Sequence, residues 1–170
     1  LYLSTMMIPI TVRLIPSYNL CRNLNMLDTY MGMILPQVAW SIPFGTFLMR
    51  QFYMGIPKQL DEAAKIDGAN HFQIFWKILL PNTKSSMTTL GIYTFISAWN
   101  NLIWMLLSVR SEGKWTVTLG ISSICGASVI KQPTWNLIMG VIVIGMIPVL
   151  ILFFAFQKYF MQSVAATGIK

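Results

Sequence analysis

Residues 55–81 read GIPKQLDEAAKIDGANHFQIFWKILLP, a polar stretch within an otherwise apolar chain. Residues 56–57, Ile-Pro, precede a run of good helix formers, and proline is favoured at the first position of a helix. Residues 67–68, Asp-Gly, predict the end of that helix, because glycine readily takes the left-handed conformation that terminates helices. Apolar side chains then recur every three or four residues over residues 72–80, as in an amphipathic helix. The stretch therefore predicts two short helices joined by a tight turn, the second of them closed by Pro81.

The composition is that of an integral membrane protein. The chain has 170 residues, of which 55% are hydrophobic and 10% charged, with a mean hydropathy of +0.62. Soluble domains carry about 25% charged residues. The net charge of +7 raises the possibility of nucleic-acid binding, but the basic residues punctuate apolar runs as they do around membrane spans, so no nucleic-acid partner is expected. The two cysteines, Cys21 and Cys125, lie far apart without a CxxC motif, which indicates neither a metal site nor a disulfide scaffold.

Charge-free runs locate the predicted spans at residues 29–49, 85–109 and 132–157. Each is long enough, because a helix needs roughly 20 residues to cross a hydrocarbon core of ~30 Å. Residues 1–16 predict the second half of a further span, since the sequence starts without a methionine or the features of a signal peptide. We therefore predict an all-α membrane protein with three full spans and one partial span, truncated at its N-terminus.

Prolines and basic residues add detail to these spans. Pro36, Pro43 and Pro148 fall inside the runs, and membrane helices tolerate proline where neighbouring helices and polar side chains satisfy the freed backbone groups. Residues 50–84 and the C-terminal tail together hold seven basic residues, against five in the segments on the other side. This small excess of basic residues weakly favours a cytoplasmic location for residues 50–84 and the tail.

Periodicity alone leaves two interpretations of the polar hairpin. It is either an amphipathic element that rests on lipid headgroups or an element that docks on a partner. The composite sequence favours the second, because EAAKIDGANHFQIFWKILLP resembles the EAA loop of ABC importer permeases, whose pattern is EAA---G---------I-LP. The matching positions are Glu62, Ala63, Ala64, Gly68, Ile78, Leu80 and Pro81.

The form with Asp67-Gly68-Ala69, preceded by Ile56-Pro57, resembles the carbohydrate-importer subfamily, the maltose-type second permease. The resemblance extends along the chain through TMMIP, LIPSYNL, LMRQF, SAWNNLIW and the tail QKYFMQSVAATGIK. Two features depart from the pattern: Met105 follows Trp104 where many relatives carry proline, and the tail is less rich in glycine than usual.

The resemblance implies the type I ABC importer permease fold, in part, with about four of six transmembrane helices. Residues 1–170 would form the permease domain and residues 53–84 its cytoplasmic coupling loop. The implied partners are a cytoplasmic ATPase dimer, a second permease subunit and an extracytoplasmic solute-binding protein, in a bacterial or archaeal cytoplasmic membrane. Ala63 and Ala64 would allow close approach to a groove of the ATPase. The residues expected to couple transport to the ATPase are Asp61, Glu62, Ala63, Ala64, Asp67, Gly68, Ala69, Phe75 and Pro81.

The family's mechanism implies that this chain is not an enzyme and holds no metal, cofactor or catalytic residue, ATP and Mg being bound by the ATPase subunits. The motif GxxxxGK[ST], which cradles ATP phosphates, does not occur in the sequence. A membrane-embedded enzyme would need His, Asp or Glu within its spans, and the three full runs contain none of these. A polyamine or amino-acid permease stays open as an alternative to a sugar permease, and a structural membrane anchor stays open as a further class.

The path of the solute is sought among polar and aromatic residues inside the spans. Amides and aromatic faces suit sugar hydroxyls and rings, although polar residues within spans also hold helices together. The candidates are Gln37, Trp40, Ser41, Tyr93, Ser97, Trp99, Asn100 and Asn101, and the Asn100-Asn101 pair is preferred. By contrast, His71 is expected to be an exposed linker residue, and Arg13, Arg22, Asp28 and Glu112 ordinary interfacial residues.

Overall fold

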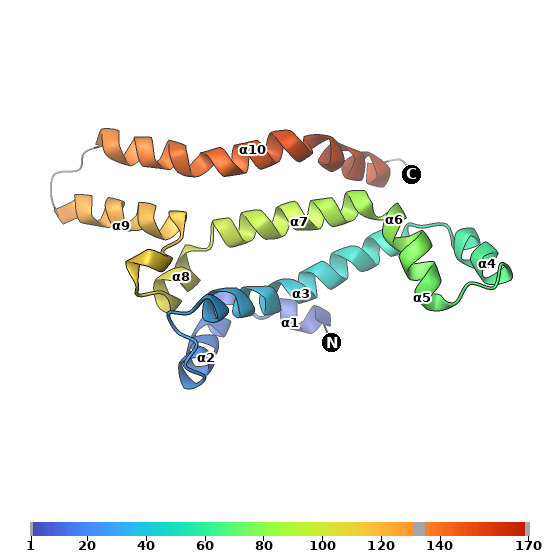
Figure 1. Cartoon of the computed structure of the whole chain (residues 1–170), viewed down its shortest axis with the longest axis horizontal. Coiled ribbons are helices and arrows are strands. Elements are labelled where there is room, and N and C mark those ends of the chain that lie inside the picture. The colour runs from blue at the N-terminus through green and yellow to red at the C-terminus, as the bar shows by residue number, and fades with distance from the viewer. Residues whose placement is uncertain (1, 131–134, 169–170) are drawn as a thin grey trace.

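The computed structural model describes residues 2–130 and 135–168, and within these ranges the regular structure is entirely helical (Figure 1). The α-helices are α1 (Tyr2–Met6), α2 (Ile10–Asn23), α3 (Tyr30–Met54), α4 (Lys58–Ile66), α5 (His71–Ile74), α6 (Leu80–Asn82), α7 (Lys84–Trp99), α8 (Leu102–Ser108), α9 (Val117–Ile130) and α10 (Trp135–Gly168). A π-helical turn, Phe75–Leu79, joins α5 to α6, and a 3-10 turn, Glu112–Lys114, precedes α9.

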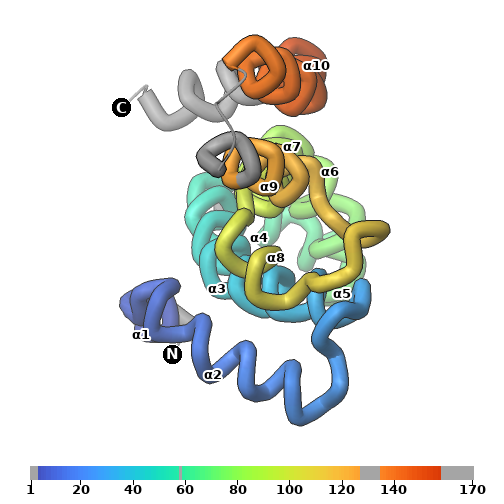
Figure 2. Tube along the Cα trace, turned by 90° about the vertical axis from the view of Figure 1, so that its left-hand side faces the viewer, coloured from blue at the N-terminus to red at the C-terminus, as the bar shows by residue number. Residues whose placement is uncertain are grey.

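The long helices lie side by side along the molecule. Helix α7 packs against α3 on one side and against α10 on the other, while α8 contacts α2, α3 and α9. The end-on view shows α10 above this stack and α1 and α2 below it (Figure 2). Helices α4 and α5 project together from one end of the molecule, the end at which α10 also finishes (Figure 1). The hairpin and the end of α10 thus lie on one side, as their shared cytoplasmic assignment requires.

Among the described residues, two helices are long and apolar enough to cross a membrane on their own, at Tyr30–Met54 and Trp135–Gln157. A third crossing is possible if α7 and α8 are taken as one span bent by 53°. The helices Tyr30–Met54 and Trp135–Gln157 confirm the predicted spans over residues 29–49 and 132–157, although residues 132–134 lie outside the described residues. Lys131 and Lys170, two of the basic residues counted to predict the topology, also lie outside them.

The predicted span over residues 85–109 is a bent pair of helices rather than one straight helix. The helix stops after Trp99, and Asn101 starts a new one, because its side-chain Oδ1 accepts a hydrogen bond from the backbone N–H of Trp104 at 3.3 Å. Asparagine favours such caps over helix interiors. The length of a charge-free run cannot distinguish one straight helix from two bent ones.

Two further segments differ from expectation. The segment predicted to be the second half of a span, residues 1–16, contains within residues 2–16 a break around residues 7–9 that separates two helices, rather than the end of one helix. The segment 110–131, taken from the sequence as a connection between spans, contains the apolar helix α9. Helix α9 packs against α8 and α10, so it extends the bundle at the end remote from the hairpin.

The most tightly packed core lies at that remote end. Trp104 is completely buried there and meets Trp40 edge-on, with ring centroids 5.2 Å apart. Side chains from α2, α3, α8 and α9 surround it, so burial of apolar surface holds the broken span against the neighbouring helices. The cluster comprises Leu14, Cys21, Met33, Trp104, Met105, Val109 and Leu119.

Asp28 connects two loops at the same end, a role that its description as an ordinary interfacial residue misses. Its carboxylate accepts hydrogen bonds from the backbone N–H groups of Arg110 and Ser111, both at 3.0 Å, and from the Ser111 hydroxyl. Lys114 lies 3.6 Å from the same carboxylate and donates to the Asp28 carbonyl. The Ser111 hydroxyl, with the two backbone donors, holds the pKa of Asp28 well below its usual range.

Candidate functional site

The first helix of the hairpin ends as the sequence predicts. Gly68 has φ +79°, its N–H donates to the carbonyl of Lys65, and the N–H of Ala69 donates to the carbonyl of Ala64. These two bonds form a Schellman motif, which satisfies carbonyls at a helix C-terminus. The start differs by one residue, because Pro57 caps the helix and Lys58 is its first residue. The turn between the two helices therefore depends on Gly68.

The second helix begins with a feature that was not predicted. Asn70 and Gln73 form a capping box, in which the Asn70 Oδ1 accepts from the Gln73 N–H at 2.8 Å and the Gln73 Oε1 accepts from the Asn70 N–H at 2.9 Å. The signal was present in the sequence as an Asn followed three residues later by Gln. Together the capping box and the Schellman motif fix both sides of a turn only a few residues long.

Pro81 does not close the second helix, contrary to the prediction. The chain stays helical to Asn82, and only Thr83 separates this helix from α7. The π-helical turn precedes the proline, with the Leu80 N–H donating to the carbonyl of Phe75, five residues back. Proline cannot donate to the residue four positions earlier, and the wider turn accommodates that loss. The hairpin is consequently joined to α7 with only Thr83 between α6 and α7, although α5 stands at an angle to α7 (Figure 1).

The hairpin exposes apolar surface. Ile66 is 86% exposed and Phe72 72% exposed, and Trp76 is 53% exposed, although the same element buries Ala64 and Ile74. Of the two alanines expected to approach a groove, only Ala63 is therefore accessible. Asp61 forms an exposed pair with Lys65 at 2.6 Å, and His71 is exposed as expected. Among the predicted coupling residues, those exposed to solvent are Glu62, Ala63, Asp67, Gly68, Phe75 and Pro81, while Asp61 and Ala69 are partly buried.

The hairpin also contacts α3. The rings of Tyr53, at the end of α3, and Phe75, in the π-helical turn, lie with centroids 6.3 Å apart in an edge-on arrangement. The hairpin is thus connected to α7 through the backbone and to α3 through an aromatic contact. A displacement of the hairpin would be transmitted to both helices.

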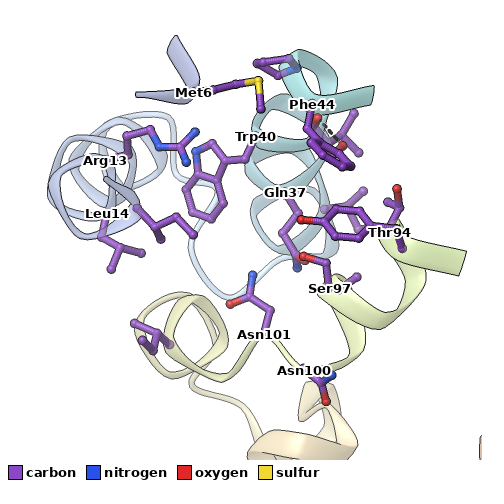
Figure 3. A pocket seen from close by; sticks show the side chains of 18 of the residues that line it. Met6, Arg13, Leu14, Gln37, Trp40, Phe44, Thr94, Ser97, Asn100 and Asn101 are labelled. Carbon is purple, nitrogen blue, oxygen red and sulfur yellow. Dashed lines mark hydrogen bonds between the residues drawn. The ribbon is translucent and has the colours of Figure 1, made fainter. Parts of the chain in front are cut away.

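A cavity of about 750 Å³ lies farther along the bundle, between α2, α3, α7 and α8 (Figure 3). It brings together seven of the eight predicted solute-path residues, which come from α3 and from the broken span. Phe44 and Tyr93 pack beside it with ring centroids 4.4 Å apart. The predicted residues that line it are Gln37, Trp40, Ser41, Tyr93, Ser97, Asn100 and Asn101.

Trp99 does not line this cavity. Its indole Nε1 donates to the carbonyl of Gly145 in α10 at 3.3 Å, and its ring stacks on Phe95 with centroids 5.6 Å apart. Its carbonyl accepts a hydrogen bond from the hydroxyl of Thr118 in α9. Trp99 thus connects the end of α7 to two neighbouring helices on the side away from the cavity.

Arg13 lines the cavity, although the sequence suggested an ordinary interfacial residue. Its side chain reaches from α2 towards α3, on the side where Trp40 lies (Figure 3). Its position inside the apolar stretch around residues 6–16 was the available signal, because ionisable groups within apolar membrane segments usually have a function.

No cluster of three or more metal-ligating side chains occurs in the part of the chain that the structure describes.

Comparison with known proteins shows the family to which this chain belongs. The family described as "Binding-protein-dependent transport system inner membrane component" matches residues 1–166. The chain belongs to this transport family. Its membership confirms the resemblance drawn from the EAA pattern, the location in the inner membrane, and the assignment to a transport family rather than to a membrane-embedded enzyme.

Relatives within the family are close enough to compare along almost the whole chain. The sn-glycerol-3-phosphate transport system permease protein UgpE of Yersinia enterocolitica is 38% identical over 160 residues, which are 94% of this chain and 56% of the relative. The arabinooligosaccharides transport system permease protein AraQ of Bacillus subtilis is 32% identical over 170 residues, which are 100% of this chain and 59% of AraQ. The chain thus spans somewhat more than half the length of the relatives it matches.

A solved structure confirms the partial permease fold. It is the crystal structure of a bacterial ABC transporter involved in the import of the acidic polysaccharide alginate, which superimposes with a TM-score of 0.73 at 28% identity. The similarity covers 94% of this chain and 59% of the solved chain. Nearly the whole of this chain therefore shares its fold with part of that transporter chain.

Proposed function

We propose that this chain is part of the membrane-spanning permease subunit of an ATP-driven importer for sugar-type solutes. In this proposal the α4–α5 hairpin docks on a cytoplasmic ATPase subunit, and the cavity between α2, α3 and α7 lies on the path of the solute. A second permease subunit and an extracytoplasmic binding protein complete the transporter. Family membership and the solutes for which UgpE and AraQ are named support this proposal.

The observation that carries the proposal is the geometry of the hairpin. It projects from the end of the bundle, has capped helices on both sides of its turn, and exposes large apolar side chains at Ile66, Phe72 and Trp76. Exposed apolar groups of this size are characteristic of interaction surfaces. The hairpin also carries the EAA signature, and its backbone continues into α7 with only Thr83 between the two helices.

This construction suits the transmission of movement. A stiff element that moves with the ATPase displaces the helices to which it is joined, whereas a slack loop would absorb the movement. The two joins are the helical continuation into α7 and the ring contact between Tyr53 and Phe75. Closure of the ATPase dimer would thereby change the angle of α3 and α7 on either side of the cavity and alternate its access.

The test is a substitution at the turn of the hairpin. A Cβ at Gly68 meets no atom within 4 Å, so Gly68→Val acts through the backbone alone, at φ +79°. Left-handed backbone costs an L-residue about 1–2 kcal/mol and more for a β-branched one. We expect the variant to reach the membrane but to lose solute uptake in reconstituted transporter while the ATPase continues to hydrolyse ATP.

Gly113→Val is the matched control. Gly113 is exposed at the other end of the molecule, a Cβ there also meets no atom within 4 Å, and its φ is not in the left-handed region. Uptake by the control should equal that of the unchanged protein. Normal coupled uptake by the Gly68 variant would contradict the docking role of the hairpin. Uptake of radiolabelled sugars against polyamines and amino acids tests the solute class.

A further inference from the structure

We propose that Arg13 makes the cavity selective for sugar-type solutes that carry a phosphate or carboxylate group. This inference rests on the proposed function, because it requires that the cavity lies on the path of the solute. It adds the chemical class of the solute and the residue that recognises it.

The first argument is that Arg13 is incompletely paired. Its side chain is partly buried, and its Nε is fully shielded from solvent without a hydrogen-bond partner among the described residues. The ion pairs within the described chain are Asp61–Lys65 and Asp28–Lys114, neither of which involves Arg13. A buried donor on a charged group is costly when it is unpaired. An anionic group of a solute in the cavity would lie beside the guanidinium group and compensate its charge.

The second argument is the charge of the cavity. None of its lining residues is aspartate or glutamate, so the positive charge of Arg13 is not neutralised within it. Its other polar side chains are neutral donors and acceptors. Asn101 is one of them: its Oδ1 caps α8, which leaves its amide N–H₂ directed into the cavity between Trp40 and Ser97. Guanidinium groups bind phosphate and carboxylate through two parallel hydrogen bonds, and such charge-assisted bonds are the strong ones.

The remaining lining suits the uncharged part of such a solute. Trp40 and Tyr93 offer aromatic faces, and Gln37 and Ser97 offer hydrogen-bonding groups for hydroxyls. The cavity therefore combines one fixed cation with a neutral polar and aromatic surface. That combination fits an acidic sugar, a sugar phosphate or a polyol phosphate better than a neutral sugar or a polycation.

The direction of the side chain argues against an anchor for lipid headgroups. The outer face of α2 is apolar and exposed, with Val12 60% exposed and Ile15 70% exposed. Arg13 turns away from this face and lines the cavity. Arg22, farther along the same helix, is exposed and is not a lining residue.

The experiment uses the complete transporter, with its ATPase and binding protein, reconstituted in proteoliposomes. Uptake is measured for sn-glycerol 3-phosphate, for an alginate-derived uronate disaccharide and for a neutral arabino-oligosaccharide. The variants are Arg13→Gln, Arg13→Lys and the control Arg22→Gln. We expect the unchanged protein to import at least one anionic probe, and Arg13→Gln to reduce that uptake by about tenfold or more, as for loss of a hydrogen bond to a charged group.

The three variants separate the possible roles of Arg13. Arg13→Lys keeps the positive charge but loses the two parallel hydrogen bonds of the guanidinium group, so uptake of the anionic probes should be intermediate and membrane abundance unchanged. Arg22→Gln should behave like the unchanged protein. If Arg13→Gln and Arg13→Lys lost uptake of the anionic and the neutral probes equally, the inference would be overturned in favour of a structural or lipid-binding role. The inference would also be overturned if neither variant changed uptake of the anionic probes. Import of the neutral probe alone by the unchanged protein would overturn it and leave the proposed function standing. Import of none of the three probes, or of polyamines instead, would contradict the proposed function itself.

Discussion

The indole Nε1 of Trp104 in α8 donates a hydrogen bond of 3.1 Å to the backbone carbonyl of Gly32 in the neighbouring helix α3. Inside α3, the partner of that carbonyl would be the N–H of the residue four positions later, which is Pro36 and has no N–H. Trp104 therefore replaces the donor that the proline removes. The expectation that a neighbouring helix satisfies the groups freed by proline is confirmed at this position.

Removal of that donor should destabilise the protein, and phenylalanine also leaves part of the indole volume unfilled. Trp104 is completely buried, so Trp104→Phe leaves the Gly32 carbonyl unpaired in an apolar core. An unsatisfied buried polar group costs about 1–3 kcal/mol. We expect a lower melting temperature of the purified transporter. Trp115→Phe is the control, because Trp115 is 37% exposed, and equal melting temperatures for the two variants would contradict the role of the hydrogen bond.

Gly32 should tolerate no side chain. A Cβ at this position would lie 2.0 Å from the backbone carbonyl oxygen of Met26, so Gly32→Ala forces α3 away from the loop before it. Overpacking of this kind costs about 1–3 kcal/mol or more. We expect reduced abundance of the folded protein in the membrane, measured by immunoblot and by fluorescence-detected gel filtration. Gly91→Ala, where a Cβ meets no atom within 4 Å, should show no such loss.

The carboxylate of Asp28 should stabilise the protein over a wide range of pH. Its hydrogen bonds from Ser111 and Arg110 lower its pKa in the folded state, while in the unfolded chain an aspartate has a pKa of about 3.9. Its stabilising effect is therefore fully present above the unfolded pKa and is lost as the pH falls towards the lower folded value. Asp28→Asn should lower the melting temperature at neutral pH, and the difference from the unchanged protein should shrink only below about pH 4.

Glu112→Gln provides the comparison for that experiment. Glu112 is an exposed acid in the same loop region, and its replacement should leave the melting temperature unchanged across the same pH range. A difference between Asp28→Asn and the unchanged protein that did not shrink at all below about pH 4 would show that the folded pKa of Asp28 is not lowered.

The elements that could be predicted from the sequence are those set by local rules. The left-handed glycine at Gly68 and the long apolar helices α3 and α10 follow from residue type and run length. The hairpin followed from the spacing of apolar residues. Each of these signals lies within a few residues of the structure it specifies, so it can be recognised without knowledge of the remaining fold.

The features that were missed depend on contacts between distant segments or on competition between local rules. The carboxylate of Asp28 accepts from residues more than eighty positions away, and Arg13 reaches the cavity only because α2 packs beside α8. At Pro81 two rules competed, and the wider π-helical turn kept the helix intact. The helix break after Trp99 was not predicted because the asparagine that caps the next helix lies inside a charge-free run.

Trp99 should affect stability rather than the choice of solute. Its indole bonds to Gly145 and its ring stacks on Phe95, away from the cavity. Trp99→Phe removes the hydrogen bond and should lower the melting temperature while leaving the relative uptake of different solutes unchanged. Tyr93→Ala, which removes an aromatic ring from the cavity lining, should raise the solute concentration needed for half-maximal uptake. A changed solute preference in Trp99→Phe would place this residue on the solute path after all.

The capping box of the hairpin should contribute to coupling. Asn70→Ala removes the acceptor for the Gln73 N–H, and loss of such a cap costs about 1 kcal/mol. Because Asn70 is exposed and far from the packed core, that cost falls on the turn of the hairpin rather than on the bundle. We expect unchanged membrane abundance but fewer solute molecules imported per ATP hydrolysed. Asn70→Ser keeps a capping oxygen and should restore the ratio, whereas equal ratios for Asn70→Ala and the unchanged protein would show that a less rigid hairpin still transmits the movement of the ATPase.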